Sequence, residues 1–319
     1  MKSYRVLSKR RVAILGYGSQ GQAQALNLRD SGIIPVIGLP SGSNSRKIAK
    51  KDRFTVMTSQ AALAASDIAV SLAPDHLHKA IFESIEPELL ANKSLIFAHG
   101  LSVAFGLVKI PKTTDLILVA PHGPGVRIRE LYKEKKTFTA FWGVERNATG
   151  LANEIAFEYA SAIGCPRQRL FRTTFRDEAI GDIFGEQAVL CGGLTGLLET
   201  GFNTLVANGL SPENAYLECV HQLDLIIDLI KRHGPAGMFE RISKTAAIGS
   251  LSAKDLLFDK GMSRKMQSLY REIAGGKFAR ALLLESETGM KNYNRNLAKL
   301  KKSKLQKAQE KIGKRIAGE

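Results

Sequence analysis

Asp182 and Glu186 are two carboxylates four residues apart in the segment 176–193, which reads RDEAIGDIFGEQAVLCGG. The apolar residues around them predict a helix, and about 3.6 residues per turn places both acids on one face, one above the other. Like charges at this spacing repel by a few tenths of a kcal/mol. Mg2+ would offset that repulsion, because it prefers oxygen ligands and is commonly held by one or two carboxylates. The alternative is a solvated acidic face.

A second polar pair with the same spacing lies further along the chain. Glu218 and Gln222 stand four residues apart in the segment 216–223, YLECVHQL, which also predicts an apolar-rich helix. Two such pairs, the first of them beside a Cys-Gly-Gly, favour a metal site over a solvated face. Helices must position both pairs, and from Gly150 onward the chain reads almost entirely as helices.

A glycine-rich turn follows the first apolar run of the chain. Residues 11–15 are largely aliphatic, residues 16–21 read GYGSQG, and a helical stretch occupies residues 22–30. Strand, G-x-G-x-x-G and helix is the order that a dinucleotide site requires. The glycines allow a tight turn, and the helix N-terminus faces the pyrophosphate. The sequence therefore predicts a bound nicotinamide dinucleotide.

The segment after the next predicted strand, residues 34–39, indicates which dinucleotide is bound. An NAD enzyme would place an acid there for the ribose 2′-hydroxyl, whereas residues 40–47 read PSGSNSRK, without an acid. Hydroxyls and cations such as Arg46 suit a 2′-phosphate, because arginine and lysine make charge-assisted hydrogen bonds to phosphate oxygens. NADPH is therefore the predicted cofactor.

Three further strand-like runs, at residues 68–72, 94–98 and 116–120, alternate with helical segments. This rhythm predicts a doubly wound parallel sheet of the Rossmann type. Ligands in such sheets bind beyond the carboxyl ends of the strands. His99 follows the second of these runs, so we favour a functional role for it over that of a structural histidine.

Composition and length set the remaining limits. A chain of 319 residues suggests two domains, which we place at residues 1–174 and 175–319. No signal peptide is evident, and no apolar run approaches the roughly 18 residues that a membrane span needs. The three cysteines lie far apart, which favours reduced thiols and a cytoplasmic location over a disulfide framework.

The net charge is +16, which raises the question of a nucleic-acid partner. The charge is concentrated at the ends: residues 291–319 alone hold ten Lys or Arg and two acids. A Lys-rich tail is more often a solvated helix than a nucleic-acid surface, so we do not expect a nucleic-acid partner.

Seven segments, in chain order, resemble ketol-acid reductoisomerase in its shorter, bacterial-type form: GYGSQGQAQALNLRDSG, FAHG, PHGPG, DIFGEQAVLCGG, AYLECVHQL, ISKTA and GKFARALLLE. The resemblance implies an N-terminal Rossmann domain and an all-helical, knotted C-terminal domain, the knot being an exception to the usual rule. It also implies a homodimer or larger assembly in which helices of two subunits build each active site.

The implied reaction has two steps. An alkyl group migrates within a 2-acetohydroxy acid with Mg2+ as the Lewis acid, and NADPH reduces the resulting 2-keto acid to a 2,3-dihydroxy acid. This reaction belongs to branched-chain amino acid biosynthesis. The resemblance assigns metal binding to Asp182, Glu186 and, from the partner subunit, Glu218; it assigns substrate binding to Ser243 and the active-site role to His99. With the glycine-rich turn and Arg46, the expected cofactor contacts are Gly16, Tyr17, Gly18, Ser19, Gln20, Gly21, Ser43, Ser45, Arg46, Asp75, His76, Leu77, His78 and Gly125.

Three positions depart from the family pattern. His122 stands where the family has lysine, Gln222 where it has a second glutamate, and Pro40 where an arginine usually begins the phosphate loop. Glutamine removes a negative charge and a proton-transfer group, although its amide oxygen can still face a metal. Histidine is only partly protonated near neutral pH. We count His122 and Gln222, with His99, as the catalytic candidates.

Three functions therefore stay open. The first is a working ketol-acid reductoisomerase with an altered metal shell. The second is a divergent paralogue that reduces 2-keto acids with NADPH but has lost the isomerisation. The third is a non-catalytic or nucleic-acid-associating protein that uses the basic tail.

Overall fold

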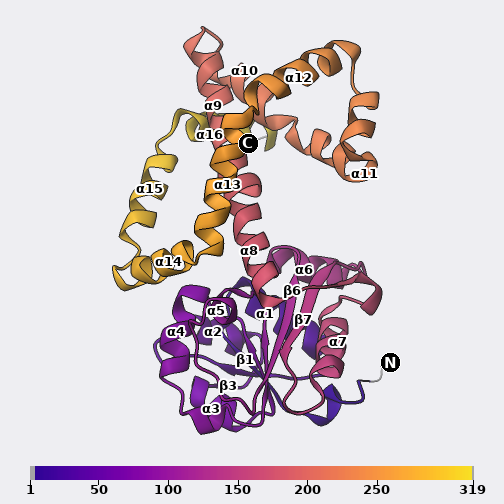
Figure 1. The fold of residues 1–319 in the computed structure, drawn as a ribbon, viewed down its shortest axis with the longest axis vertical. Helices are drawn as coiled ribbons and strands as arrows, with labels where there is room; N and C mark the ends of the chain where they lie inside the picture. Colours follow the sequence, from indigo (N-terminus) through magenta and orange to yellow (C-terminus); the bar gives the residue numbers. More distant parts are fainter. Residues whose placement is uncertain (1–3, 318–319) are drawn as a thin grey trace. The chain divides into compact units, whose positions relative to one another are not determined.

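The computed structural model describes residues 4–317, which form two compact units that divide between Gly181 and Asp182. The first unit holds a sheet with helices around it (Figure 1). Its strands lie in the order β3-β2-β1-β4-β5-β6-β7-β8. The strands are β1 (Val12–Leu15), β2 (Val36–Gly38), β3 (Val56–Met57), β4 (Ile68–Ser71), β5 (Ser94–Phe97), β6 (Asp115–Pro121), β7 (Ala140–Arg146) and β8 (Leu170–Arg172).

The centre of the sheet is parallel. Strand β1 pairs in parallel with β2 on one side and β4 on the other, so the strand order reverses beside it. These observations confirm the predicted Rossmann-type sheet. Strand β7 was not foreseen: it runs antiparallel to β6, and β8 then pairs in parallel with β7. The short apolar run of β7 carries no information about strand direction.

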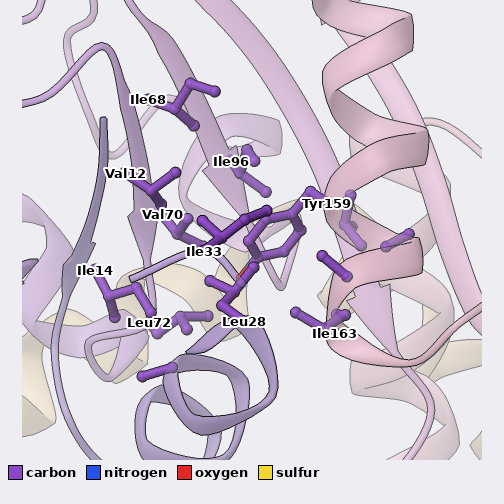
Figure 2. Packing of buried hydrophobic residues seen from close by; sticks show 14 of the residues in the cluster. Val12, Ile14, Leu28, Ile33, Ile68, Val70, Leu72, Ile96, Tyr159 and Ile163 are labelled. Carbon is purple, nitrogen blue, oxygen red and sulfur yellow. The ribbon is translucent and has the colours of Figure 1, made fainter. Parts of the chain in front are cut away.

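Helices cover both faces of this sheet. They are η1 (Leu7–Lys9), α1 (Ser19–Asp30), α2 (Ser45–Lys51), α3 (Ser59–Ala64), α4 (Asp75–Glu83), η2 (Pro87–Leu89), α5 (Leu101–Ala104), α6 (Gly125–Lys133), α7 (Ala152–Ile163) and η3 (Arg167–Arg169). Helices α1, α6 and α7 pack on one face, where Figure 2 shows the Tyr159 ring among aliphatic side chains such as Val70 and Leu28. Leu63, Phe82 and Phe175 belong to the core on the other face.

The second unit is helical throughout its described residues. It contains the end of α8 (Phe175–Gly185), then η4 (Glu186–Leu190), α9 (Gly192–Ala207), α10 (Pro212–Tyr216), η5 (Leu217–His221), α11 (Leu223–Arg241), α12 (Lys244–Leu257), α13 (Lys260–Ala274), α14 (Lys277–Glu287), α15 (Lys291–Lys301) and α16 (Lys304–Ala317). This confirms the predicted helical C-terminal region, while the knot stays a prediction.

The second unit leaves much apolar surface uncovered in a single chain. Its buried cluster is small and centres on Phe202, Ala215 and Ala308. In contrast, Leu190, Ile248 and Leu256 are 67%, 69% and 79% exposed. Exposed apolar surface of this extent is typical of a protein interface.

One helical run corrects an expectation from the sequence. Residues Phe175–Ala207 form a run long and apolar enough, by length and composition alone, to cross a membrane. From the sequence we expected no apolar run approaching the roughly 18 residues that a membrane span needs. The same run carries Asp182 and Glu186, side chains that are costly in a bilayer.

Candidate active site

The glycine-rich turn after β1 has the geometry of a dinucleotide cradle. Gly16 adopts φ +103°, and a Cβ there would stand 2.4 Å from the backbone nitrogen of Ala73. A Cβ on Gly21 would stand 2.4 Å from the carbonyl oxygen of Gly16, so these two glycines bring α1 and the β4 loop close to the turn. A Cβ on Gly18 would meet nothing within 4 Å, which leaves room for a ligand to approach the backbone.

A pocket of about 450 Å³ opens beside this turn. It lies where the strand order reverses, the place at which open α/β sheets bind dinucleotides. Among the predicted cofactor contacts, those that line it are Gly16, Tyr17, Gly18, Ser43, Ser45 and Leu77. The residues present therefore fit a dinucleotide at this place.

Arg46 turns its guanidinium toward the protein backbone. Nη1 donates hydrogen bonds to the carbonyl oxygens of Leu39 at 2.8 Å and Met57 at 3.0 Å. These bonds tie α2 to the ends of β2 and β3. The predicted contact of Arg46 with a 2′-phosphate stays a prediction, whereas Ser43 and Ser45 already face the pocket.

A chain of hydrogen bonds, buried at one end and exposed at the other, connects α7 and α1 to the turn after β6. The Tyr159 hydroxyl donates to Gln24 Oε1 at 2.5 Å, and Gln24 Nε2 donates to Gln20 Oε1 at 2.9 Å. Gln20 Nε2 then donates to the carbonyl oxygen of Gly123 at 2.8 Å. This chain fixes the turn that carries His122, and Gln24 and Tyr159 are members that sequence reasoning missed.

His122 is exposed at the end of β6. Its Nδ1 lies 2.9 Å from the Thr139 hydroxyl, and its ring meets the Phe141 ring edge to face at 4.4 Å. Strand β7, which supplies Phe141, therefore holds the imidazole. A lysine at this position could keep neither the ring contact nor the hydroxyl bond in the same form.

His99 and Asp75 come together from neighbouring elements. His99 follows β5, Asp75 begins α4, and Nδ1 of His99 lies 3.1 Å from Oδ2 of Asp75. Burial raises the pKa of Asp75, but the hydrogen bond and charge of His99 and the charge of His78 outweigh it, so the net pKa is lowered. The structure thus gathers three predicted site residues into one cluster at the carboxyl ends of β4 and β5.

The start of α8 is fixed against the loop that carries His99. The backbone nitrogen of Gly100 donates to Oε2 of Glu178 at 2.5 Å, and Glu178 is only 5% exposed. A Cβ on Gly100 would stand 2.1 Å from the carbonyl oxygen of Phe175. Sequence reasoning missed Glu178, and the glycine after His99 was the only signal of this close approach.

Both predicted metal-binding segments contain a π-helical turn, which the α-helical spacing did not reveal. Glu186 opens η4, and Glu218 lies within η5. In η4 the backbone nitrogen of Cys191 donates to the carbonyl oxygen of Glu186 at 2.9 Å, a bond between residues five apart. π-Turns within α-helices occur frequently at functional sites.

The two glycines after Cys191 are required by this turn. A Cβ on Gly192 would stand 2.4 Å from the carbonyl oxygen of Gln187, and one on Gly193 would stand 2.0 Å from that of Ala188. Side chains at these positions would push the wide turn apart. The two glycines of the Cys-Gly-Gly sequence therefore allow the backbone to form the π-helical turn that begins at Glu186.

The acids of the second unit offer suitable ligands but do not gather within one chain. Asp182, Glu186 and Glu218 are exposed, and carboxylate oxygens are the donors that Mg2+ prefers. Among residues 4–317, no group of three or more His, Cys, Asp or Glu side chains forms a metal site. The donor chemistry of these carboxylates fits Mg2+.

Ser243 and Gln222 occupy helix boundaries. Ser243 caps α12, where its Oγ accepts a hydrogen bond from the backbone nitrogen of Ala246 at 3.1 Å. Its hydroxyl proton can still be donated to another acceptor. Gln222 follows η5 and donates through Nε2 to the carbonyl oxygen of Leu217 at 3.5 Å.

Comparison with known proteins identifies the family. Residues 6–168 match the model of the acetohydroxy acid isomeroreductase NADPH-binding domain, and residues 175–317 match that of the ketol-acid reductoisomerase C-terminal domain. The chain belongs to the ketol-acid reductoisomerase family. The predicted resemblance, the NADPH-binding Rossmann domain and the NADP-dependent oxidoreductase class are thereby confirmed.

Individual relatives agree with this assignment. The chain is 41% identical to a ketol-acid reductoisomerase (NADP(+)) of Kineococcus radiotolerans over 294 residues, covering 92% of this chain and 86% of the relative. An NADH-preferring ketol-acid reductoisomerase from an uncultured archaeon has 34% identity and a TM-score of 0.92, over 98% of this chain and 96% of that one. A semialdehyde dehydrogenase NAD-binding protein from Cupriavidus necator, with 17% identity and a TM-score of 0.66 over 84% and 98% of the two chains, shares the fold.

Proposed function

We propose that this ketol-acid reductoisomerase catalyses both steps of the reaction, alkyl migration in a 2-acetohydroxy acid and reduction by NADPH, and that it requires Mg2+. The observation that carries the proposal is the pair of π-helical turns that present Glu186 and Glu218, with Asp182 one turn before the first. This set of oxygen ligands suits alkyl migration, in which a metal must hold the substrate hydroxyl and carbonyl oxygens together. When bound, Mg2+ supplies Lewis acidity that stabilises negative charge on the substrate oxygens.

The remaining roles follow from the chain's own residues. Asp182 and Glu186 of one subunit, with Glu218 of the partner subunit, would hold the metal, and Ser243 would donate its hydroxyl proton to the substrate carboxylate or hydroxyl. His99 would move a proton at the carboxyl ends of β4 and β5. His122 stands where the family pattern has a lysine, which is a fixed cation. Its imidazole would bind the substrate or the cofactor with a charge that depends on pH.

NADPH would lie along the glycine-rich turn with its 2′-phosphate at the loop before α2. Ser43 and Ser45 line the pocket there, and Lys47 is an exposed cation in the first turn of α2. Arg46 would act mainly by holding this loop, because its guanidinium donates to backbone carbonyls. Hydroxyls and a lysine suit a phosphate dianion, although they bind it less rigidly than an arginine fork.

We further propose a homodimer or larger assembly in the cytoplasm, with residues 1–174 and 175–319 as its two domains. The exposed leucines and isoleucines of the second unit support a self-association surface. Ligands from a second chain would also complete the carboxylate set, which does not gather within the described part of one chain.

The second candidate function is an NADPH-dependent 2-keto acid reductase without isomerisation. It is favoured by Gln222, which removes a charge and a proton acceptor from the metal-binding segment, and by the histidine at position 122. Both changes would weaken the migration step more than hydride transfer, because migration needs proton movement at the substrate hydroxyl in addition to the metal shell.

NADPH consumption distinguishes the two functions. The purified protein is supplied with 2-acetolactate or with a 3-hydroxy-2-keto acid, each with and without Mg2+. Turnover of 2-acetolactate only when Mg2+ is present supports the full reaction. Turnover of the 3-hydroxy-2-keto acid alone supports the reductase, and the absence of turnover on both, with NADPH still bound, contradicts both.

A further inference from the structure

We propose that Asp75 is a positioning residue that holds the proton of the neutral His99 imidazole on Nδ1 and so leaves Nε2 as the nitrogen that accepts or returns a proton. The tautomer assignment follows from the geometry of this chain. Its consequence for turnover rests on the proposed function of His99.

The first observation is the bond between the two side chains. Nδ1 of His99 lies 3.1 Å from Oδ2 of Asp75, within hydrogen-bond distance. The Asp75 side chain is 30% exposed and that of His99 is 20% exposed, so both groups are partly shielded from solvent. The lowered pKa of Asp75 keeps its carboxyl ionised at neutral pH, and an ionised carboxylate can only accept a hydrogen bond. Nδ1 of His99 must therefore be the donor.

The second observation excludes the competing histidine. His78 also approaches Asp75, with Nδ1 3.7 Å from Oδ1, and its side chain is 3% exposed. Its Nε2, however, lies 3.0 Å from the carbonyl oxygen of Ala73, which can only accept. Nε2 of His78 therefore carries the proton. Burial lowers the pKa of His78, which is consistent with a neutral ring that carries a single proton.

The remaining nitrogen of His78 is then an acceptor. Its Nδ1 lies 2.7 Å from the Ser102 hydroxyl, which can donate to it. Without a proton, Nδ1 of His78 has nothing to donate to Asp75, in agreement with the longer distance of 3.7 Å. The two histidines thus carry their protons on opposite nitrogens, and the carboxylate of Asp75 serves His99.

The elements around the pair keep this arrangement in place. Asp75 is the first residue of α4, where the positive end of the helix dipole favours a carboxylate. His78, one turn later in α4, is fixed by Ser102 of α5 and by the Ser71 hydroxyl, 3.1 Å from its Nε2, at the end of β4. The buried His78 anchors α4 to the end of β4 and to α5, and α4 in turn aims Asp75 at His99.

The same logic operates where a carboxylate orients a catalytic imidazole in serine proteases. There an Asp→Asn change preserves the geometry but lowers kcat about 10⁴-fold, because the amide stabilises the wrong tautomer. A neutral imidazole with the proton on Nδ1 has a lone pair on Nε2. That lone pair can take the proton of a substrate hydroxyl and give it back later in the cycle.

Nitrogen NMR of the histidine side chains tests the tautomers directly. The protein is labelled with 15N-histidine, the His99 and His78 signals are assigned from the variants His99→Gln and His78→Gln, and spectra are taken near pH 8.5, about two units above the ordinary histidine pKa. We expect protonated Nδ1 for His99 and protonated Nε2 for His78. A His99 ring with its proton on Nε2, or a mixture of tautomers that Asp75→Asn leaves unchanged, overturns the proposal.

Kinetics test the consequence. Asp75→Asn is expected to lower kcat about 10²-fold or more, to change the NADPH dissociation constant less than about 3-fold, and to shift His99 toward the Nε2-protonated tautomer. Asp75→Glu, which keeps the charge, should restore part of kcat. Asp67→Asn is the matched control: this carboxylate binds Arg11 at the opposite end of β4, so kcat should not change.

The outcomes separate the positioning role from the alternatives. Weaker NADPH binding with an unchanged kcat would make Asp75 a cofactor contact and overturn the proposal. A wild-type protein that turns over neither substrate would contradict the proposed function, while the NMR spectra would still decide whether Asp75 sets the tautomer.

Discussion

Gln20 Nε2 donates a hydrogen bond to the carbonyl oxygen of Gly123 at 2.8 Å and so joins the first turn of α1 to the turn after β6. Gly125 closes the same junction, because a Cβ there would stand 2.2 Å from the carbonyl oxygen of Ser19. The dinucleotide turn and the turn that carries His122 are therefore held as one piece.

The first prediction concerns this link. Gln20→Ala removes the donor and leaves the buried Gln24 amide without its partner, so the His122 turn should loosen. We expect kcat/KM for NADPH to fall about tenfold, or roughly 1.4 kcal/mol. Gln60→Ala is the matched control, because Gln60 makes a similar bond to the carbonyl oxygen of Ser84 on an exposed surface. Equal losses in both variants would contradict a specific role for Gln20.

A second prediction separates two neighbouring cations. Arg46→Ala removes donors from the carbonyls of Leu39 and Met57, so it should lower the thermal midpoint more than it alters the choice between NADPH and NADH. Lys47→Ala should lower the preference for NADPH several-fold and leave the midpoint near the wild-type value. Melting curves and kinetics with both cofactors decide this. A selective loss of NADPH turnover in Arg46→Ala, without a change in melting, would place its guanidinium on the phosphate.

The third prediction concerns the π-helical turn of η4. Gly193→Ala would put a Cβ 2.0 Å from the carbonyl oxygen of Ala188, so we expect a loss of about 1–3 kcal/mol of stability and weaker Mg2+ binding. In Gly196→Ala, on the following turn of α9, the Cβ meets nothing within 4 Å of the same chain. That variant should keep or slightly raise stability. Calorimetry with Mg2+ measures both effects, and identical behaviour of the two variants would contradict the steric explanation.

The fourth prediction addresses the departures from the family pattern. The double variant His122→Lys with Gln222→Glu restores a fixed cation and a carboxylate. We expect faster turnover of 2-acetolactate in Mg2+, while turnover of the 3-hydroxy-2-keto acid and NADPH affinity change little. Each single variant is the control for the other. A double variant that gains nothing over wild type would mean that the rest of the site has adapted to the present residues.

The fifth prediction follows from a buried thiol. Cys165 is fully buried, and burial raises its pKa from 9.0 to about 12. The native thiol therefore keeps its proton at pH 9–10, where the thiol of the unfolded chain begins to lose it. The unfolded state then binds fewer protons, so stability falls as pH rises, by up to about 1.4 kcal/mol per pH unit.

Denaturant unfolding at pH 8 and pH 10 measures this contribution. Wild type should lose about 1 kcal/mol more than Cys165→Ala between the two conditions. Cys191→Ala, which removes an exposed thiol, should lose as much as wild type. A wild type and a Cys165→Ala protein with the same pH dependence would show that the buried thiol does not contribute.

The parts of the fold that the sequence predicted are those whose requirements are local. Glycines at positions 16 and 18 of GYGSQG predicted a tight turn and room for a ligand beside the backbone. The structure agrees, because Gly16 has a positive φ and a Cβ on Gly18 would meet nothing within 4 Å. The alternation of apolar runs and helical segments likewise predicted the parallel sheet. These signals lie within short windows of the chain.

The features that the sequence did not predict depend on contacts with residues distant in the chain, or on the hydrogen bonding of the backbone. Acids four residues apart look the same in an α-helix and in a π-turn, so η4 and η5 went unnoticed. From the sequence, Arg46 was predicted to bind the 2′-phosphate. In the structure its guanidinium donates hydrogen bonds to the carbonyl oxygens of Leu39 and Met57, which no short window of sequence could indicate. Glu178 could be connected with Gly100 only once both were placed in space.

The π-turn η4 has a consequence for how this helix tolerates insertions and deletions. A turn closed by bonds between residues five apart holds one residue more than an α-helical turn. Deleting a single residue between Glu186 and Leu190 would therefore turn the wide turn into an ordinary α-helical turn and leave the rotational position of α9 nearly unchanged, whereas the same deletion in a regular α-helical turn would rotate everything after it by about 100° about the helix axis. Such a chain would keep its helix content and the same stripe of α9 side chains toward its neighbours, yet it would lose the wide turn that Glu186 opens.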